Sequence, residues 1–194
     1  MSCHRIVIKG GHKVCLPVTS REEYLELRDS KANTENRIMA GMGNEDAKRN
    51  LVQMNYSCLP NEDGTLKGST RMSTTIGMDI DHIKASSMEK VKQNILAKKD
   101  ELGLLMLELS ARGEGFHLVF KRHPELSQED NLRWASKLLG VEYDKGAKDI
   151  TRVFFTTTAS EEDLLYLDDE IFKNEEVKPT PPQALPLKGV GGNR

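Results

Sequence analysis

The stretch Ser73–Lys84, STTIGMDIDHIK, constrains the fold of this chain more than any other. Its apolar residues alternate with small or acidic ones, and this period of two predicts a β-strand with Asp79 and Asp81 on one face. The two carboxylates would lie about 6.6 Å apart along the strand and would repel each other. Hard divalent ions such as Mg²⁺ or Mn²⁺ between them would relieve that repulsion. The opposite face, with Met78 and Ile80, is expected to pack on a helix.

The same D-x-D tripeptide has a simpler interpretation. At the end of a strand it can carry the chain out of the core towards solvent and cap a turn. Short acidic motifs are common, so the tripeptide alone leaves both interpretations open. Residues later in the chain favour the metal site.

Composition limits the class of protein. The 194 residues suffice for one domain with a real core, and 37% hydrophobic and 30% charged residues are typical of a globular protein. The chain has no apolar run long enough for a membrane span and no apolar segment of a signal peptide, so we expect a cytoplasmic protein without membrane contact. The formal net charge of −2 means that any contact with nucleic acid is local.

The remaining pattern predicts an α/β (α+β) fold, with a central, largely antiparallel sheet covered by capped helices. Further strands are predicted at 5–8, 14–18, 104–109, 116–121, 151–156 and 164–167, and helices at 20–29, 45–54, 86–103 and 127–139. A Gly10-Gly11 turn would pair Ile6 with Cys15, which separates the nearby cysteines and histidines and argues against a zinc site. We assign residues 1–172 to the folded domain, and 173–194, rich in proline and then glycine, to a linker or tail.

A second group of polar residues surrounds the strand predicted at 116–121. His117 and Lys121 lie on one face of it, and the turn just upstream runs from Ser110 through Arg112 to Gly115. Backbone amides of such a glycine-containing turn can approach a phosphate closely. A lone histidine on a strand is more often a structural hydrogen-bonding residue. A histidine between this turn and a lysine is a better candidate for binding a triphosphate.

A third group lies in the segment YDKGAKDITR. Asp144 precedes a short polar segment, and Arg152 begins an apolar strand. One interpretation is a surface turn followed by an edge-strand charge. In the other, Asp144 is a third carboxylate of the metal site and Arg152 reaches the same cleft.

In their order and spacing, the three groups resemble the catalytic motifs of the archaeo-eukaryotic primase superfamily, the primase-polymerases. The combination of SARGEGFHLVF with YDKGAKDITRVFF is most similar to the primase-like VirE N-terminal domain of bacterial mobile elements, over roughly residues 48–166. The resemblance implies a divalent-metal-dependent nucleotidyltransferase, a DNA primase or polymerase, acting in replication of a mobile element, phage or plasmid.

The resemblance also implies roles for individual residues. Asp79, Asp81 and Asp144 would be the catalytic metal ligands, with Mg²⁺ or Mn²⁺ as cofactor. Asp149 is the alternative third acid, although the spacing of eight residues from Asp144 to Arg152 favours Asp144.

Nucleotide binding is assigned to a second set of side chains. The resemblance implies that His117 contacts the phosphates and that Arg152 binds the nucleotide; the further candidates are Lys121, Arg112 and Ser110. The histidine motif is stretched, with six residues between Ser110 and His117. The expected partners are nucleoside triphosphates, a single-stranded DNA template and a helicase, to which such domains are often joined.

Two other functions remain open. A metal-dependent nuclease or phosphodiesterase would use the same carboxylates to activate water instead of a hydroxyl. A non-catalytic DNA-binding replication module would retain the fold without the chemistry.

Overall fold

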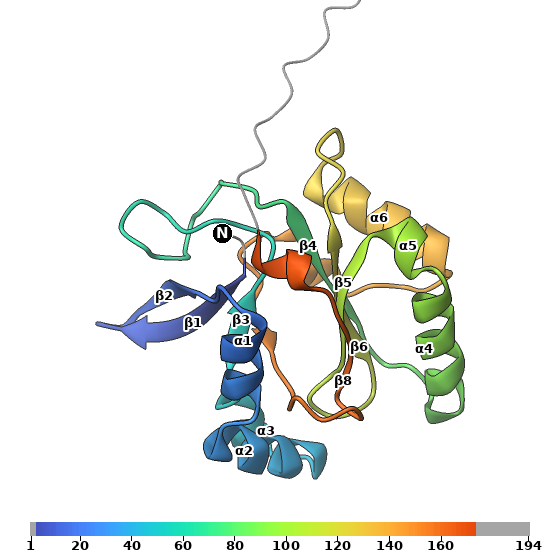
Figure 1. Ribbon diagram of the computed structural model, residues 1–194, viewed down its shortest axis with the longest axis horizontal. Coiled ribbons are helices and arrows are strands. Elements are labelled where there is room, and N and C mark those ends of the chain that lie inside the picture. Colours follow the sequence, from blue (N-terminus) through green and yellow to red (C-terminus); the bar gives the residue numbers. More distant parts are fainter. Residues whose placement is uncertain (1–2, 174–194) are drawn as a thin grey trace, which may run out of the picture.

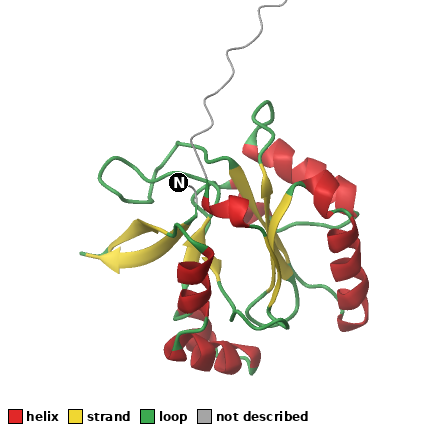
Figure 2. Cartoon of the chain, in the orientation of Figure 1, coloured by secondary structure: helices red, strands yellow, loops and turns green. Residues whose placement is uncertain are grey.

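The computed structural model describes residues 3–173 and contains two antiparallel four-stranded sheets with helices packed on them (Figures 1 and 2). The predicted α+β class is confirmed, although the strands divide between two sheets. The tail predicted at 173–194 lies, apart from Lys173, outside the described residues.

The first sheet has the strand order β2-β1-β3-β7. Its strands are β1 (His4–Lys9), β2 (His12–Pro17), β3 (Gln53–Asn55) and β7 (Phe154–Phe155). Gly10 and Gly11 join β1 to β2 with φ angles of 57° and 78°, as a tight hairpin turn requires. The hairpin pairs Ile6 with Cys15, as the sequence predicted.

The second sheet has the order β4-β6-β5-β8. Its strands are β4 (Thr75–Ile80), β5 (Leu104–Leu109), β6 (Phe116–Lys121) and β8 (Leu164–Leu167). Every residue of β4 is buried, and β4 pairs antiparallel with β6 so that Asp79 lies opposite His117. The D-x-D stretch therefore forms the predicted strand, and the predicted histidine lies beside its first acid.

The helices of residues 3–173 lie between these strands in the sequence. They are α1 (Arg21–Arg28), α2 (Lys31–Gly41), α3 (Glu45–Arg49), α4 (Met88–Ala97), α5 (Lys99–Leu102) and α6 (Gln128–Leu139), with short 3₁₀ helices η1 (Ala85–Ser87), η2 (Lys145–Lys148) and η3 (Asp169–Phe172). The hydroxyls of Ser20 and Ser127 accept backbone N–H groups at the starts of α1 and α6. In this described part of the chain, no helix has the length and apolar character needed to cross a membrane.

Three elements differ from the sequence predictions. The helix predicted at 86–103 is divided: residues 85–87 form a 3₁₀ turn, and α4 begins at Met88 without a side-chain cap. The helix predicted to reach Met54 ends at Arg49, because Met54 is fully buried and pairs with Phe154 in the first sheet. This pairing also limits the strand predicted at 151–156 to Phe154–Phe155.

The two faces of β4 pack against different layers. Ile76, Met78 and Ile80 contribute to a core that includes residues of α4 and α6, as predicted for a helix-facing side. Gly77 lies on the opposite face, next to Phe154 of the first sheet. Figure 1 shows α4, α5 and α6 on one side of the second sheet and β1–β3 on the other.

We predict that Gly77→Ala destabilises the fold, because a Cβ at this position would lie 2.6 Å from Cε2 of Phe154. Overpacking of this kind costs about 1–3 kcal/mol, measurable by urea denaturation. The loss should be smaller in a Phe154→Leu background, where the ring is gone. Equal losses in both backgrounds would contradict the close approach of the two sheets.

Candidate metal centre

The acidic end of β4 is the centre of the site. Asp79 lies within the strand with its side chain buried, whereas Asp81 follows the strand and is exposed. His82 comes next and has a φ of 55°, a left-handed conformation that is uncommon for a residue other than glycine. The strand therefore ends at the second acid with a sharp change of backbone direction.

Asp144 reaches this end of β4 through a main-chain contact. Its backbone N–H donates to the carbonyl oxygen of Asp79 at 2.8 Å, and its Oδ1 accepts the N–H of Gly146 at the start of η2. Asp149, by contrast, is exposed and accepts the N–H and hydroxyl of Thr151. The structure thus brings Asp144 to the acid pair, in preference to Asp149.

The three carboxylates form one cluster. One oxygen atom each of Asp79, Asp81 and Asp144 lies within 4.8 Å of the others. Oδ1 of Asp79 is buried and has no hydrogen-bond partner, which is costly for a carboxylate unless a cation approaches it. Carboxylate oxygens are the ligands that hard divalent cations prefer. These residues could therefore hold a metal ion.

The surroundings of Asp79 disfavour its charged form. Burial raises the pKa of its carboxyl to about 6; the cationic groups of His117 and Arg152 oppose this rise, and the charges of Asp81 and Asp144 add to it. Nη2 of Arg152 lies 3.1 Å from Oδ2 of Asp144 and 3.7 Å from Oδ2 of Asp79. The guanidinium therefore bridges two of the acids.

His117 lies between two carboxylates. Its Nδ1 is 3.2 Å from Oε2 of Glu108 and its Nε2 is 3.6 Å from Oδ1 of Asp79. Burial lowers the pKa of the imidazole, but the hydrogen bond to Glu108 and the surrounding acidic charges outweigh burial, so the pKa is raised overall.

The cluster opens into a pocket of about 510 Å³ that is lined from both sheets. Its cationic side chains are Lys13, Lys48, Arg112 and Arg152, and its aromatic ones are Phe154 and Phe155. The pocket therefore combines acidic, basic and aromatic groups.

Ser110 and Arg112 also line this pocket, as predicted for the turn before β6. Ser110 is buried, whereas Arg112 is exposed and forms an ion pair with Glu45 of α3. A side chain at Gly115 would collide with the carbonyl oxygen of Ile80. Glycine at this position therefore lets the turn lie directly against the end of β4.

Lys121 is a correction to the sequence prediction, which placed it in the cleft with His117. It lies at the other end of β6, opposite Thr75, and its ammonium is 2.7 Å from Oε2 of Glu170 in η3. The two residues are four positions apart along the strand, about 13 Å. Sharing a face of a strand therefore did not bring Lys121 to the acids.

Several residues of the site were missed from the sequence. Glu108 carries a signal, because it is an acid inside the apolar run LLMLEL. Lys13, Lys48 and Phe155 carry none, since they reach the pocket only through the packing of the first sheet and α3 against the second sheet. No protein-family model, no curated protein and no solved structure matches the chain.

We predict that Mn²⁺ raises the Tm of the protein and that Asp79→Asn abolishes this shift. An ion at one hundred times its Kd would stabilise the folded state by about 2.7 kcal/mol. Asp149→Asn is the matched control, because Asp149 is close to Asp144 in the sequence but lies outside the cluster. This variant should keep the Tm shift. A shift that persists in Asp79→Asn would place the ion elsewhere.

Without divalent ions, Asp79→Asn should stabilise the protein at about pH 8 by roughly 1–3 kcal/mol, because it removes a buried charge. The pKa of Asp79 is raised from its ordinary value of 3.8 to about 6, so the cost of its charge to folding is complete above about pH 6 and fades as pH falls between these two values. The gain should therefore shrink at about pH 5, as measured by urea denaturation. A marked loss of stability at the higher pH would instead support the turn-capping role.

Proposed function

We propose that this chain is a divalent-metal-dependent nucleotidyltransferase of the primase-polymerase type, using Mg²⁺ or Mn²⁺. The observation that carries the proposal is the convergence of three aspartates. One of them has a buried oxygen without a hydrogen bond, and two, Asp79 and Asp81, line a pocket that also holds cationic side chains. Anionic ligands and cationic side chains together complement a metal-bound triphosphate.

Bound divalent ions would supply the activation of an attacking 3′-hydroxyl and the stabilisation of leaving pyrophosphate. Asp79, Asp81 and Asp144 would hold these ions. Arg152 bridges two of the acids and is partly exposed, so its guanidinium is available to a phosphate once cations neutralise the carboxylates. Arginine suits this role because its planar fork can make bidentate contacts to phosphate.

The flat, uncharged base of a nucleotide also has a complementary group in the pocket. The ring of Phe155 is partly exposed to it, and Nζ of Lys48 lies 5.8 Å from the ring centroid. Nucleobases stack on such exposed aromatic rings, with about 1–3 kcal/mol per base. A nucleoside triphosphate therefore fits the pocket better than an isolated phosphate does. The single-stranded DNA template, a helicase partner and a role in mobile-element, phage or plasmid replication rest on the resemblance alone.

The deciding experiment is an incorporation assay with Mn²⁺, labelled single-stranded DNA, with or without a primer, and nucleoside triphosphates. Incorporation that Asp79→Asn and Asp81→Asn abolish would support the proposal. Cleavage of the DNA without incorporation would indicate a nuclease. DNA binding without either reaction would indicate a non-catalytic replication module.

Arg152→Lys should weaken nucleotide binding in the presence of Mn²⁺ and leave binding of labelled single-stranded DNA nearly unchanged, because lysine cannot copy the bidentate contact. Two titrations on this variant measure the two affinities. Lys121→Met is the control: it removes another side chain predicted to bind the nucleotide, but one that lies outside the pocket, and should change neither affinity. Equal losses for nucleotide and DNA would assign Arg152 to a nucleic-acid surface.

A further inference from the structure

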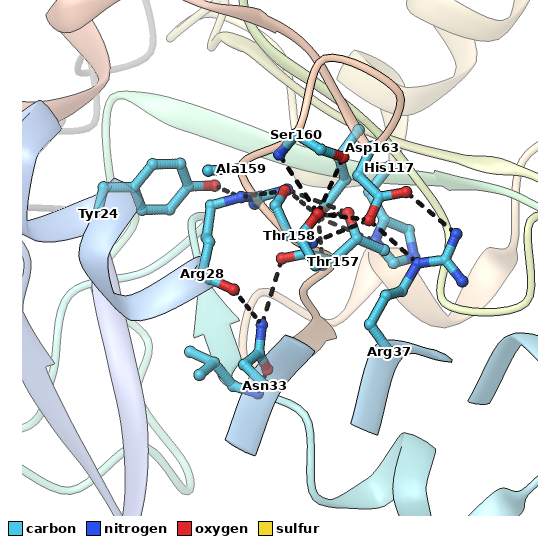
Figure 3. Close-up of polar contacts among 12 residues, drawn as sticks. Tyr24, Arg28, Asn33, Arg37, His117, Thr157, Thr158, Ala159, Ser160 and Asp163 are labelled. Atoms are coloured by element: carbon cyan, nitrogen blue, oxygen red, sulfur yellow. Dashed lines mark hydrogen bonds and ion pairs between the residues drawn. The ribbon is translucent and has the colours of Figure 1, made fainter. Parts of the chain in front are cut away.

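Behind His117 lies a fully buried charged network that the proposed chemistry does not use directly. Glu108 of β5 and Arg28 of α1 have no exposed side-chain surface, and Nη2 of Arg28 lies 2.9 Å from Oε1 of Glu108. The same Oε1 accepts the N–H and the hydroxyl of Thr157, both at 3.1 Å. Figure 3 shows Arg28, Thr157 and His117 gathered at this point.

The two oxygens of Glu108 have different partners. Oε1 accepts from Arg28 and Thr157, whereas Oε2 faces Nδ1 of His117 at 3.2 Å. Arg28 lowers the pKa of Glu108 against the effect of burial, so the carboxyl is ionised. An ionised carboxylate only accepts hydrogen bonds. The proton of this contact therefore resides on Nδ1.

This contact determines which nitrogen faces the pocket. With Nδ1 bound to Glu108, Nε2 is directed towards Asp79 at 3.6 Å. The ring is held on another side by an edge contact with Phe154, with ring centroids 5.2 Å apart. The orientation of His117 is thus fixed from the sheet interior.

We propose that Glu108 is a positioning residue: it holds His117 with a proton on Nδ1 and presents Nε2 to the acidic pocket, while Arg28 fixes Glu108. The assignment of Nε2 to a nucleotide phosphate rests on the proposed function; the position of the proton does not.

A contribution to stability does not by itself explain why this chain has a buried ion pair here. Buried ion pairs often stabilise a protein no more than well-packed apolar residues of similar volume, since desolvation offsets the attraction. The surrounding strand is otherwise apolar, so an apolar side chain would suit the position. Arg37 and Asp163 form a second, less buried ion pair nearby, which contacts no histidine and so provides a matched control (Figure 3).

The first measurement is ¹⁵N NMR of the histidine rings in the wild-type, metal-free protein near neutral pH. His117→Gln identifies the resonances of His117 among the five histidines. We expect Nδ1 to resonate as a protonated, hydrogen-bonded nitrogen. An unprotonated Nδ1 with a proton only on Nε2 would overturn the proposal, whatever the behaviour of any variant.

The second measurement compares Glu108→Gln with Asp163→Asn. Glutamine keeps the shape of glutamate, and with its oxygen towards Arg28 its amide N–H₂ faces Nδ1, so the proton should move to Nε2. Asp163→Asn should leave the proton on Nδ1 although it also disrupts a partly buried ion pair. An unchanged Nδ1 proton in a folded Glu108→Gln variant would overturn the role of Glu108; if that variant does not fold, the wild-type spectrum decides.

The third measurement is nucleotide affinity with Mn²⁺. Groups that orient a metal-binding histidine typically affect metal affinity or activity about 10–100-fold. By analogy, Glu108→Gln should lose about 10-fold or more in nucleotide affinity, and Asp163→Asn should not. Equal affinity in Glu108→Gln and wild type would overturn the positioning role. If the wild-type protein binds no nucleotide, the proposed function fails, while the proton on Nδ1 is still decided by NMR.

Discussion

The site depends on the burial of an acidic side chain within a β-sheet. Asp79 is buried between β4 and the first sheet, where its charge is poorly solvated. Two basic side chains lie next to this charge. His117 lies opposite Asp79 in β6, and Arg152 approaches Asp79 from the segment that follows η2. Beyond His117, Glu108 and Arg28 continue the series, so that acidic and basic groups alternate from the pocket to α1.

The packing of the sheets gives this arrangement its shape. Gly77, two residues before Asp79, has no side chain where the ring of Phe154 presses against β4. The first sheet can therefore approach the acid-bearing face closely and supply Phe155 and Lys13 to the pocket. The glycine in β4 thus determines how close the pocket residues of the first sheet lie to Asp79.

Local pattern predicted the parts of the site that lie on single elements. The alternation in β4 placed Asp79 correctly opposite to the helix-facing Met78, and the alternation in β6 placed His117 on its face. Lys121 shows the limit of this reasoning, because a shared face says nothing about distance along a strand. The residues around Asp144 left two interpretations open and the resemblance favoured the third carboxylate, since the backbone contact that brings Asp144 to Asp79 joins residues far apart in sequence. Nothing local to Met54 revealed that pairing in the first sheet would end its predicted helix.

The bond between the N–H of Asp144 and the carbonyl of Asp79 joins main chain to main chain. The spacing of these two acids is therefore set by backbone, and a change of either side chain alters the ligand without moving its attachment point. The separation of Asp79 and Asp144 in the sequence also has a consequence during synthesis. A nascent chain that has formed β4 and β6 still lacks the third acid until residue 144 has emerged, so the three carboxylates that could hold a cation come together only after that point.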